Sequence, residues 1–254
     1  MPDELHVELP REGAARVPAH MRPIRLKSTV CSLALVASAA LAGCGGSGAS
    51  SNGLESKSPE QILSAAKEAA SKAASVHVSG SIINEKKPIS LDMELVAGKG
   101  AKGHLALEGL GFDIVEVEKA FYMKGSTAFY QRVAGASAAQ LLQGKWLKVP
   151  TTGGEFASLA QLTNLSKLID ATLGNHGTLA KGSTSTVEGQ KAVSITDTTK
   201  GGTLYVAASG PAYPLEISKS GSDAGKVTFD RWNKPVSLSA PSGAVNIDQL
   251  QSGK

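Results

Sequence analysis

The feature that most constrains the fold is a change in hydrophobic period at Ser75. Upstream of it, apolar residues recur at the spacing of one face of a helix. Downstream, Val76 and Val78 alternate with His77 and Ser79, and similar alternation continues through much of the chain. A period of two places successive side chains on opposite faces of a strand. The sequence therefore predicts a helix followed by half-buried antiparallel strands with one apolar and one polar face.

The predicted helix begins after Ser58 and ends near Ala74. Ser58 suits the N-cap, Pro59 fits the first helical position, and Gln61 stands where a capping box requires it. The apolar residues that follow at helical spacing are Ile62, Leu63, Ala66, Ala69, Ala70 and Ala73. Because this face is mostly alanine, we expect the helix to pack closely on a sheet.

The alternation is interrupted between Thr127 and Leu173. This interval contains a short predicted strand at 145–149. It also contains a pair of predicted helices with apolar positions at Leu159, Leu162, Leu165, Leu168 and Ile169. Helices inserted within a sheet bury their apolar stripe against one of its faces, so we expect this pair to lie across the sheet.

Strand patterns resume at Gly177 and continue to Val236 and Leu238. They bring the total to about ten or eleven strands, too many for a sheet that twists normally to stay flat. Aromatic residues make up only 4% of the chain, so the core must consist mainly of Val, Leu, Ile and Ala. We therefore predict an α+β fold in which a large curled antiparallel sheet is covered by helices.

A second pattern lies near the N-terminus. The segment 21–27 is basic, an apolar run follows from Thr29, and Leu41-Ala42-Gly43-Cys44 ends it. This order is typical of a secretory signal, and the run is shorter than the roughly 20 residues that span a bilayer. The last four residues resemble the lipobox of bacterial lipoproteins, in which the cysteine is diacylated on sulfur and becomes the first mature residue.

The residue types of this motif suit that chemistry. Ala42 and Gly43 are small enough for a peptidase to approach the bond, Leu41 completes the recognition pattern, and Cys44 supplies the thiol that accepts the acyl group. The alternative is an ordinary signal peptide with a cysteine at this position by chance.

The motif divides the chain into four parts. Residues 1–20 carry acidic side chains that are unusual ahead of an export signal, so we interpret them as a misassigned start or an extension. Residues 21–43 are the predicted signal peptide, 44–57 a Gly/Ser-rich tether too polar to pack, and 58–250 the folded domain. Cys31 leaves with the signal, so no disulfide is expected. The predicted location is the outer face of the cell membrane, with a lipid anchor.

The order of lipobox, helix, strands, helical insertion and further strands resembles the LolA-like superfamily, and within it the LppX and LprG lipoproteins of actinobacteria. The most specific part is 229–236, with Trp-Asn-Lys-Pro-Val at its end, which is similar to the closing strand of that branch. Residues 74–80 resemble its first strand and 214–217 its penultimate hairpin. The resemblance covers 58–241. It implies a half-barrel sheet wrapped over helices, an apolar cavity between them, and carriage of acylated lipids across the cell envelope.

A curled sheet beside an alanine-rich helix leaves volume that large side chains do not fill, and an apolar cavity can take an apolar ligand. Small residues can also simply let the two layers pack closely. The candidate lining residues on the sheet are Val78, Ile82, Leu91, Met93, Leu95, Leu105 and Leu107, and those on the helices are Leu162, Leu165 and Ile169. An ordinary core position is the alternative for each of them.

Other classes of function find little support. A formal net charge of +4 without a cluster of Lys or Arg is not the pattern of a nucleic-acid-binding protein. Ser64 and Lys67 match the Ser-x-x-Lys of penicillin-recognising enzymes, but the other motifs of that class are missing. His77, His104 and His176 lack metal-ligand spacing, and we expect the first two to face solvent. We predict no catalytic residue, no metal and no cofactor.

The sequence therefore predicts a membrane-anchored extracytoplasmic lipoprotein that binds an apolar ligand, an acylated lipid, as a carrier or chaperone of the cell envelope. Its expected partners are the membrane, through the diacylglyceryl group on Cys44, the lipid, and a membrane transporter or another envelope protein. The alternative is an envelope sensor or structural interaction module without lipid cargo.

Overall fold

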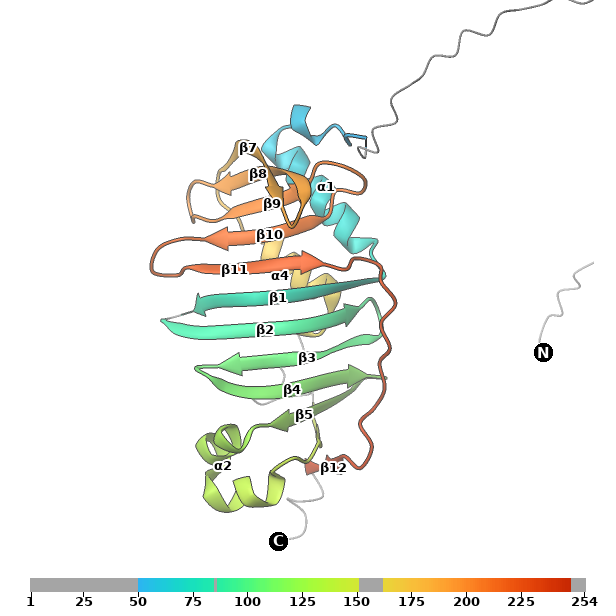
Figure 1. Ribbon diagram of the computed structural model, residues 1–254, viewed down its shortest axis with the longest axis vertical. Coiled ribbons are helices and arrows are strands. Elements are labelled where there is room, and N and C mark those ends of the chain that lie inside the picture. The colour runs from blue at the N-terminus through green and yellow to red at the C-terminus, as the bar shows by residue number, and fades with distance from the viewer. Residues whose placement is uncertain (1–49, 85, 151–161, 248–254) are drawn as a thin grey trace, which may run out of the picture. The chain divides into compact units, whose positions relative to one another are not determined.

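The computed structural model describes residues 50–84, 86–150 and 162–247 (Figure 1). The chain divides into two compact units, Met1–Gly46 and Ser47–Lys254, and every described residue belongs to the second. The predicted signal peptide, Cys44 and Leu159 lie outside the described residues.

Twelve strands form one open, curled sheet in the described part of the chain (Figure 1). Their order is β12-β6-β5-β4-β3-β2-β1-β11-β10-β9-β8-β7. The first six are β1 (Ser75–Asn84), β2 (Lys87–Val96), β3 (Gly100–Leu107), β4 (Leu110–Val117), β5 (Ala120–Gly125) and β6 (Leu147–Val149). The others are β7 (Leu179–Val187), β8 (Gln190–Asp197), β9 (Thr203–Ala207), β10 (Pro214–Lys219), β11 (Gly225–Asp230) and β12 (Val245–Asn246). All neighbours pair antiparallel except β12, which runs parallel to β6.

The period-two pattern produces two different sides of the sheet, which confirms the predicted α+β fold. Val78 lies between Met93 on β2 and Phe229 on β11, and each of the three is 2% exposed. The next residue, Ser79, lies between Asp92 and Thr228 on the opposite side. We call the two sides the helix-facing side and the polar side. The buried apolar residues of the helix-facing side form one continuous hydrophobic cluster with the helices.

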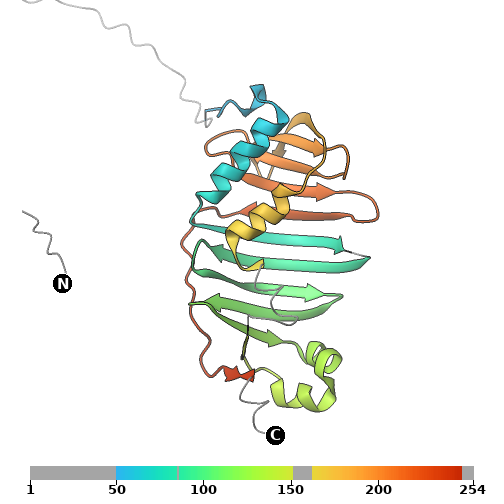
Figure 2. The ribbon, with the colours of Figure 1, turned by 180° about the vertical axis from the view of Figure 1, so that it is seen from behind.

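Two helices cross the helix-facing side (Figure 2). Helix α1 (Pro59–Ser71) begins as predicted, because the Ser58 hydroxyl accepts a hydrogen bond from the Gln61 N–H and the Gln61 side chain accepts one from the Ser58 N–H. Helix α4 (Leu165–Gly174) buries Leu165, Ile169 and Leu173 in the core. The second half of the predicted helical pair therefore lies across the sheet, as expected from its apolar stripe.

Helix α2 (Thr127–Leu142) departs from the expectation that inserted helices cross a face, because it lies beyond the β5 end of the sheet (Figures 1 and 2). Its buried side chains are those of Tyr130 and Ala139, too few for an apolar stripe. Gly135, with a φ of 85°, interrupts the helical geometry. No helix in the described ranges is long and apolar enough to cross a membrane.

The N-terminal boundary of the domain also differs from the prediction, because the segment 51–56 packs on the sheet. Ser51 forms a β-bridge with Ser209, and the Asn52 side-chain amide donates to the backbone carbonyls of Ala207 and Gly210. Leu54, in the short 3-10 helix η1 (Leu54–Ser56), is 5% exposed and joins the core. A tether that runs to Lys57 is therefore wrong. The segment packs although most of its residues are polar, because the Asn52 side chain satisfies two backbone carbonyls and Leu54 buries apolar surface.

The predicted closing strand through Val236 and Leu238 is wrong as well, because β11 ends at Asp230. Arg231 and Asn233 have positive φ angles of 50° and 58°, a region that few residues other than glycine adopt. The following Pro235 has no N–H to donate to a strand. The closing segment, 231–244, instead runs along the ends of the strands to β12 (Figure 1).

Candidate ligand-binding site

The helix-facing side of the sheet carries the residues that were predicted to line a cavity. Six of them are at most 4% exposed and belong to the main hydrophobic cluster: Val78, Met93, Leu95, Leu105, Leu165 and Ile169. Three more, Ile82, Leu91 and Leu107, are half-buried, and Leu162 is 37% exposed. The fold thus brings β1, β2, β3 and α4 together. Whether a ligand displaces part of this packing stays a prediction.

A pocket of about 290 Å³ opens between the helices and the second half of the sheet, at the C-terminal end of α4. We call it the lysine pocket. Its apolar lining comes from both helices and from four strands: Leu63, Leu173, Leu179, Ile195, Leu204 and Ile217. Its polar lining includes the exposed side chains of His176 and Lys200 and the partly exposed side chain of Lys219. The burial pattern gives the pocket an apolar floor and a cationic rim.

Asp197 holds the two sides of this rim together. Its carboxylate accepts hydrogen bonds from the backbone N–H groups of Thr199 and Lys200, at 2.9 and 2.8 Å, in the β8–β9 turn. It also accepts one at 2.7 Å from the N–H of Gly177, which follows α4. The N–H groups of Lys200, Gly177 and Thr199 lower the pKa of the Asp197 carboxyl from its ordinary value. In addition, the Lys200 ammonium donates to the side-chain oxygen of Asn175, so the turn is tied to the end of α4.

A second pocket, of about 680 Å³, lies at the N-terminal end of α4. It is bordered by the β2–β3 and β4–β5 turns, by Thr163 and Asn164, and by Val236 and Leu238 of the closing segment. Glu116 lies here on the helix-facing side of β4, and the hydroxyl of the fully buried Thr163 donates to its carboxylate. Helix α4 therefore has a pocket at each end.

Polar side chains line a seam between α1 and α4. A gap of about 450 Å³ between them is lined by Ile169 and by six polar side chains: Ser64, Lys67, Glu68, Ser71, Ser166 and Asp170. The two residues that match Ser-x-x-Lys are part of this seam, where Ser64 is exposed and Lys67 half-buried. The seam therefore adds little apolar contact between the two helices, whose buried apolar side chains belong to the main hydrophobic cluster.

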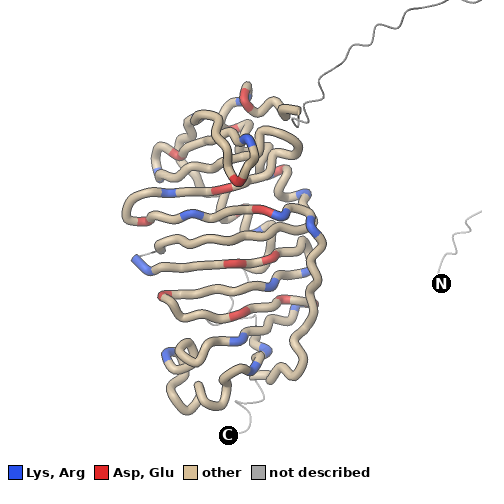
Figure 3. The backbone as a smooth tube through the Cα atoms, viewed as in Figure 1, with Lys and Arg blue, Asp and Glu red and all other residues tan. Residues whose placement is uncertain are grey.

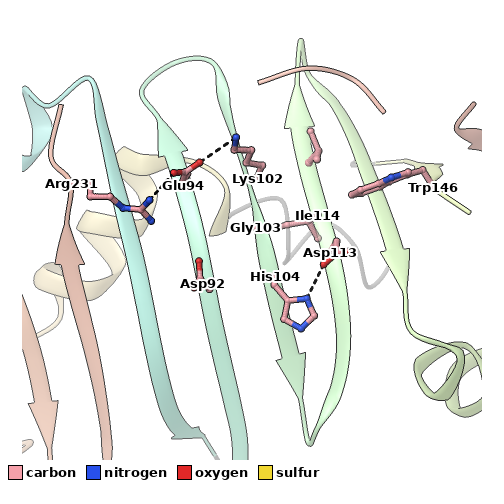
Figure 4. A pocket seen from close by; sticks show the side chains of 10 residues that line it. Asp92, Glu94, Lys102, Gly103, His104, Asp113, Ile114, Trp146 and Arg231 are labelled. Atoms are coloured by element: carbon pink, nitrogen blue, oxygen red, sulfur yellow. Dashed lines mark hydrogen bonds and ion pairs between the residues drawn. The ribbon is translucent and has the colours of Figure 1, made fainter. Parts of the chain in front are cut away.

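The polar side of the sheet carries a shallow groove of about 480 Å³ lined by charged residues and Trp146 (Figure 4). Glu94 pairs with Arg231 at 3.2 Å and with Lys102 at 3.3 Å. His104 Nδ1 lies 2.8 Å from an oxygen of Asp113. These charges are paired with one another across neighbouring strands, an arrangement that stabilises a sheet surface.

His77 was expected to face solvent, and this expectation is wrong. The ring lies on the polar side, but its side chain is only 11% exposed. Its Nδ1 lies 2.5 Å from Asp230 Oδ1 and its Nε2 lies 3.0 Å from Asp92 Oδ1. Asp230 of β11 lies directly opposite His77, and Asp92 of β2 lies diagonally from it, opposite Ser79 on the same side of the sheet, so the two carboxylates cover the ring. The described residues contain no group of three or more His, Cys, Asp or Glu side chains that could hold a metal ion.

No protein-family model matches the sequence, and no curated protein sequence is similar to it. Among solved structures, LprF from Mycobacterium bovis has 16% identity and a TM-score of 0.51, and the alignment covers 74% of this chain and 100% of LprF. The chain has the fold of LprF. The Mycobacterium tuberculosis lipoprotein LppX has 18% identity and a TM-score of 0.47, over 72% of this chain and 100% of LppX.

The similarity to LprF confirms the fold that the resemblance to LppX and LprG lipoproteins implied. At 16% identity it establishes the fold and does not establish a function, because one fold serves many functions.

The lining of the lysine pocket was not predicted from the sequence. Ile195, Leu204 and Ile217 stand at the apolar phase of their strands, and the same alternation that identified Val78 could have identified them. The association of Asp197 with Gly177 had no such signal, because it depends on how the β8–β9 turn meets the end of α4.

Proposed function

We propose that this protein is an extracytoplasmic lipoprotein that binds an acylated lipid between its sheet and helices and carries it within the cell envelope. The support comes from three independent features. The sequence has a lipobox-like Leu41–Cys44, the chain has the fold of LprF, and the layer between sheet and helices contains an apolar pocket with a cationic rim.

The lysine pocket is the observation that carries this proposal. Its floor is formed by aliphatic side chains of α1, α4, β7, β8, β9 and β10, which suits a hydrocarbon chain. Lys200 and Lys219 at the rim suit a negatively charged or polar headgroup that remains near solvent. An amphiphile with an acyl chain matches both parts, whereas a wholly polar ligand would leave the floor unused.

The size of the pocket indicates how a lipid would enter. A volume of about 290 Å³ is near the lower limit of roughly 300–1,000 Å³ for small-molecule sites, so it holds part of an acyl chain. We expect α1 and α4 to move apart along their polar seam when more of the chain enters. The apolar surface that the chain then buries contributes about 25 cal/mol per Å², which offsets the loss of contacts between the helices.

Lipid content tests the proposal directly. The unit Ser47–Lys254 contains the whole described core, so it can be produced without the first 46 residues. Organic extracts of this purified unit should contain an acylated lipid at a stoichiometric level by mass spectrometry. A unit that carries no lipid, and gains none from vesicles, would favour the alternative of a sensor or interaction module.

A single substitution localises the ligand. Ile217→Trp adds an indole to the floor of the lysine pocket and should lower lipid loading several-fold, because the added volume competes with the acyl chain. Ser218→Trp is the matched control, since Ser218 is the next residue of β10 and faces the polar side. Equal loading of the two variants, with unchanged thermal stability, would place the ligand elsewhere.

The anchor is tested separately. Cys44→Ala removes the only thiol that the lipobox offers for acylation, so a folded protein should appear in the culture medium instead of the membrane fraction. Two acyl chains hold a protein on a bilayer stably where one holds it weakly, so loss of the anchor should release most of it. Retention of the variant in the membrane would show that another element anchors the chain.

A further inference from the structure

The end of the sheet that carries α2 has an unusual charge distribution. We call residues 119–150, which form β5, α2, β6 and their connections, the α2 surface. They contain no Asp or Glu and five basic residues, namely Lys119, Lys124, Arg132, Lys145 and Lys148. Figure 3 shows basic positions and no acidic ones among the described residues of this end. The basic residues are spread along the sequence, so no short run of Lys or Arg reveals them.

Several of these cations have no ion-pair partner within the ranges that the structure describes. Lys124 pairs with Asp113 at 3.0 Å and lies 4.9 Å from the centre of the Trp146 ring. In contrast, Arg132, Lys145 and Lys148 are exposed and have no ion-pair partner among the described residues. Glu118 adjoins the segment at its N-terminal boundary, and two other acidic residues, Glu155 and Asp248, lie outside the described ranges.

The same surface exposes large apolar side chains. Val133 is 59% and Leu141 68% exposed, the highest values for large hydrophobic residues in the described part of the chain. The helix that carries them is nevertheless fixed. The Tyr130 hydroxyl accepts a hydrogen bond at 2.9 Å from the Gly125 N–H, and the ring of Phe129 packs 5.1 Å from that of Phe112. Exposed apolar groups on a fixed helix indicate an interaction surface and not a loosely folded one.

We propose that the α2 surface docks this protein on an anionic lipid bilayer. Unpaired cations beside exposed aliphatic side chains complement negatively charged headgroups above a hydrocarbon layer. A second copy of the chain is a poorer fit, because a symmetric contact would bring the unpaired cations of both copies together. The proposal rests on the extracytoplasmic location proposed above, and it does not depend on the lipid cargo.

Vesicle flotation of the unit Ser47–Lys254 tests this docking without the lipid anchor. The unit should float with vesicles of phosphatidylcholine mixed with phosphatidylglycerol and should not float with phosphatidylcholine alone. Binding should weaken as NaCl is added, because salt screens the attraction between exposed charges. A unit without lipid cargo should float equally well, so a failure of the carrier function and a failure of docking are distinguishable.

Two sets of substitutions separate the charged and apolar contributions. The triple variant Arg132→Gln, Lys145→Gln, Lys148→Gln should lose about fivefold in binding for each cation removed. The pair Val133→Ser and Leu141→Ser should lose about tenfold or more in binding to the mixed vesicles. The matched control, Lys57→Gln, Lys86→Gln, Lys167→Gln, removes the same charge from exposed positions elsewhere and should bind nearly as well as the parent unit.

Three results would overturn the proposal. The first is absence of flotation with the mixed vesicles, and the second is an equal loss of binding in the triple variant and its control. The third is a dimer in sedimentation analysis that the Val133→Ser, Leu141→Ser pair dissociates, since the surface would then bind a second copy. All the substituted residues are exposed, so unchanged melting temperatures should accompany each comparison.

Discussion

Asp197 shows how one half-buried carboxylate organises two segments that are far apart in the sequence. Its side chain accepts hydrogen bonds from N–H groups of the β8–β9 turn and from Gly177 after α4, and so defines the rim of the lysine pocket.

The burial of His77 also depends on residues of other segments. The alternation predicted its side of the strand, but its burial depends on Asp92 and Asp230, which belong to neighbouring strands.

The pH dependence of stability should report on Asp197. Because hydrogen bonds from the N–H groups of Lys200, Gly177 and Thr199 lower its pKa in the folded protein, the unfolded chain binds more protons there. The stabilisation is fully present above the ordinary value of 3.8 and is lost as pH falls through the lower, folded pKa. Urea unfolding at neutral and acidic pH should show a smaller decrease in stability for Asp197→Asn than for the parent protein. Asp170→Asn, at an exposed position of α4, should behave like the parent protein.

At the scale of elements, locally encoded features were predictable from the sequence. The capping box fixed the start of α1, and the alternation identified β1 to β5 with the correct apolar side. The two-residue β12 was not predictable, because its parallel pairing with β6 depends on the path of the closing segment. The position of α2 was not predictable either, because its anchor is a bond between Tyr130 and the backbone of β5.

The candidate site divides in the same way. Its strand residues could be assigned to the helix-facing side from their phase alone, and α4 from its apolar stripe. The location of open space could not be predicted, since it depends on how far apart α1 and α4 lie and on the turn that Asp197 holds. Volume between layers is a property of packing, which no single segment specifies.

At the scale of the whole molecule, the first described residues, which follow the proposed anchor in the sequence, and the α2 surface lie at opposite ends of the sheet. Ser51 pairs next to β9, whereas α2 follows β5, and seven strand steps separate β5 from β9. At about 4.8 Å per step the two ends are roughly 34 Å apart along the sheet. The six residues that follow Cys44 up to Ser50 reach at most about 21 Å when fully extended. Both ends can therefore contact one bilayer only when the direction from strand to strand across the sheet runs parallel to the bilayer surface.

We expect the acylated protein to adopt this orientation, because the anchor raises the effective concentration of the α2 surface at its own membrane. After removal of the signal and acylation of Cys44, Leu141→Cys would supply the only free thiol for an environment-sensitive fluorophore. In vesicles that contain phosphatidylglycerol, the probe should report an apolar environment at every protein dilution. The same protein in vesicles of phosphatidylcholine alone is the control and should leave the probe in water. Clustering of the phosphatidylglycerol vesicles by the anchored protein would contradict this orientation. The α2 surface would then bind a second membrane and bridge two bilayers.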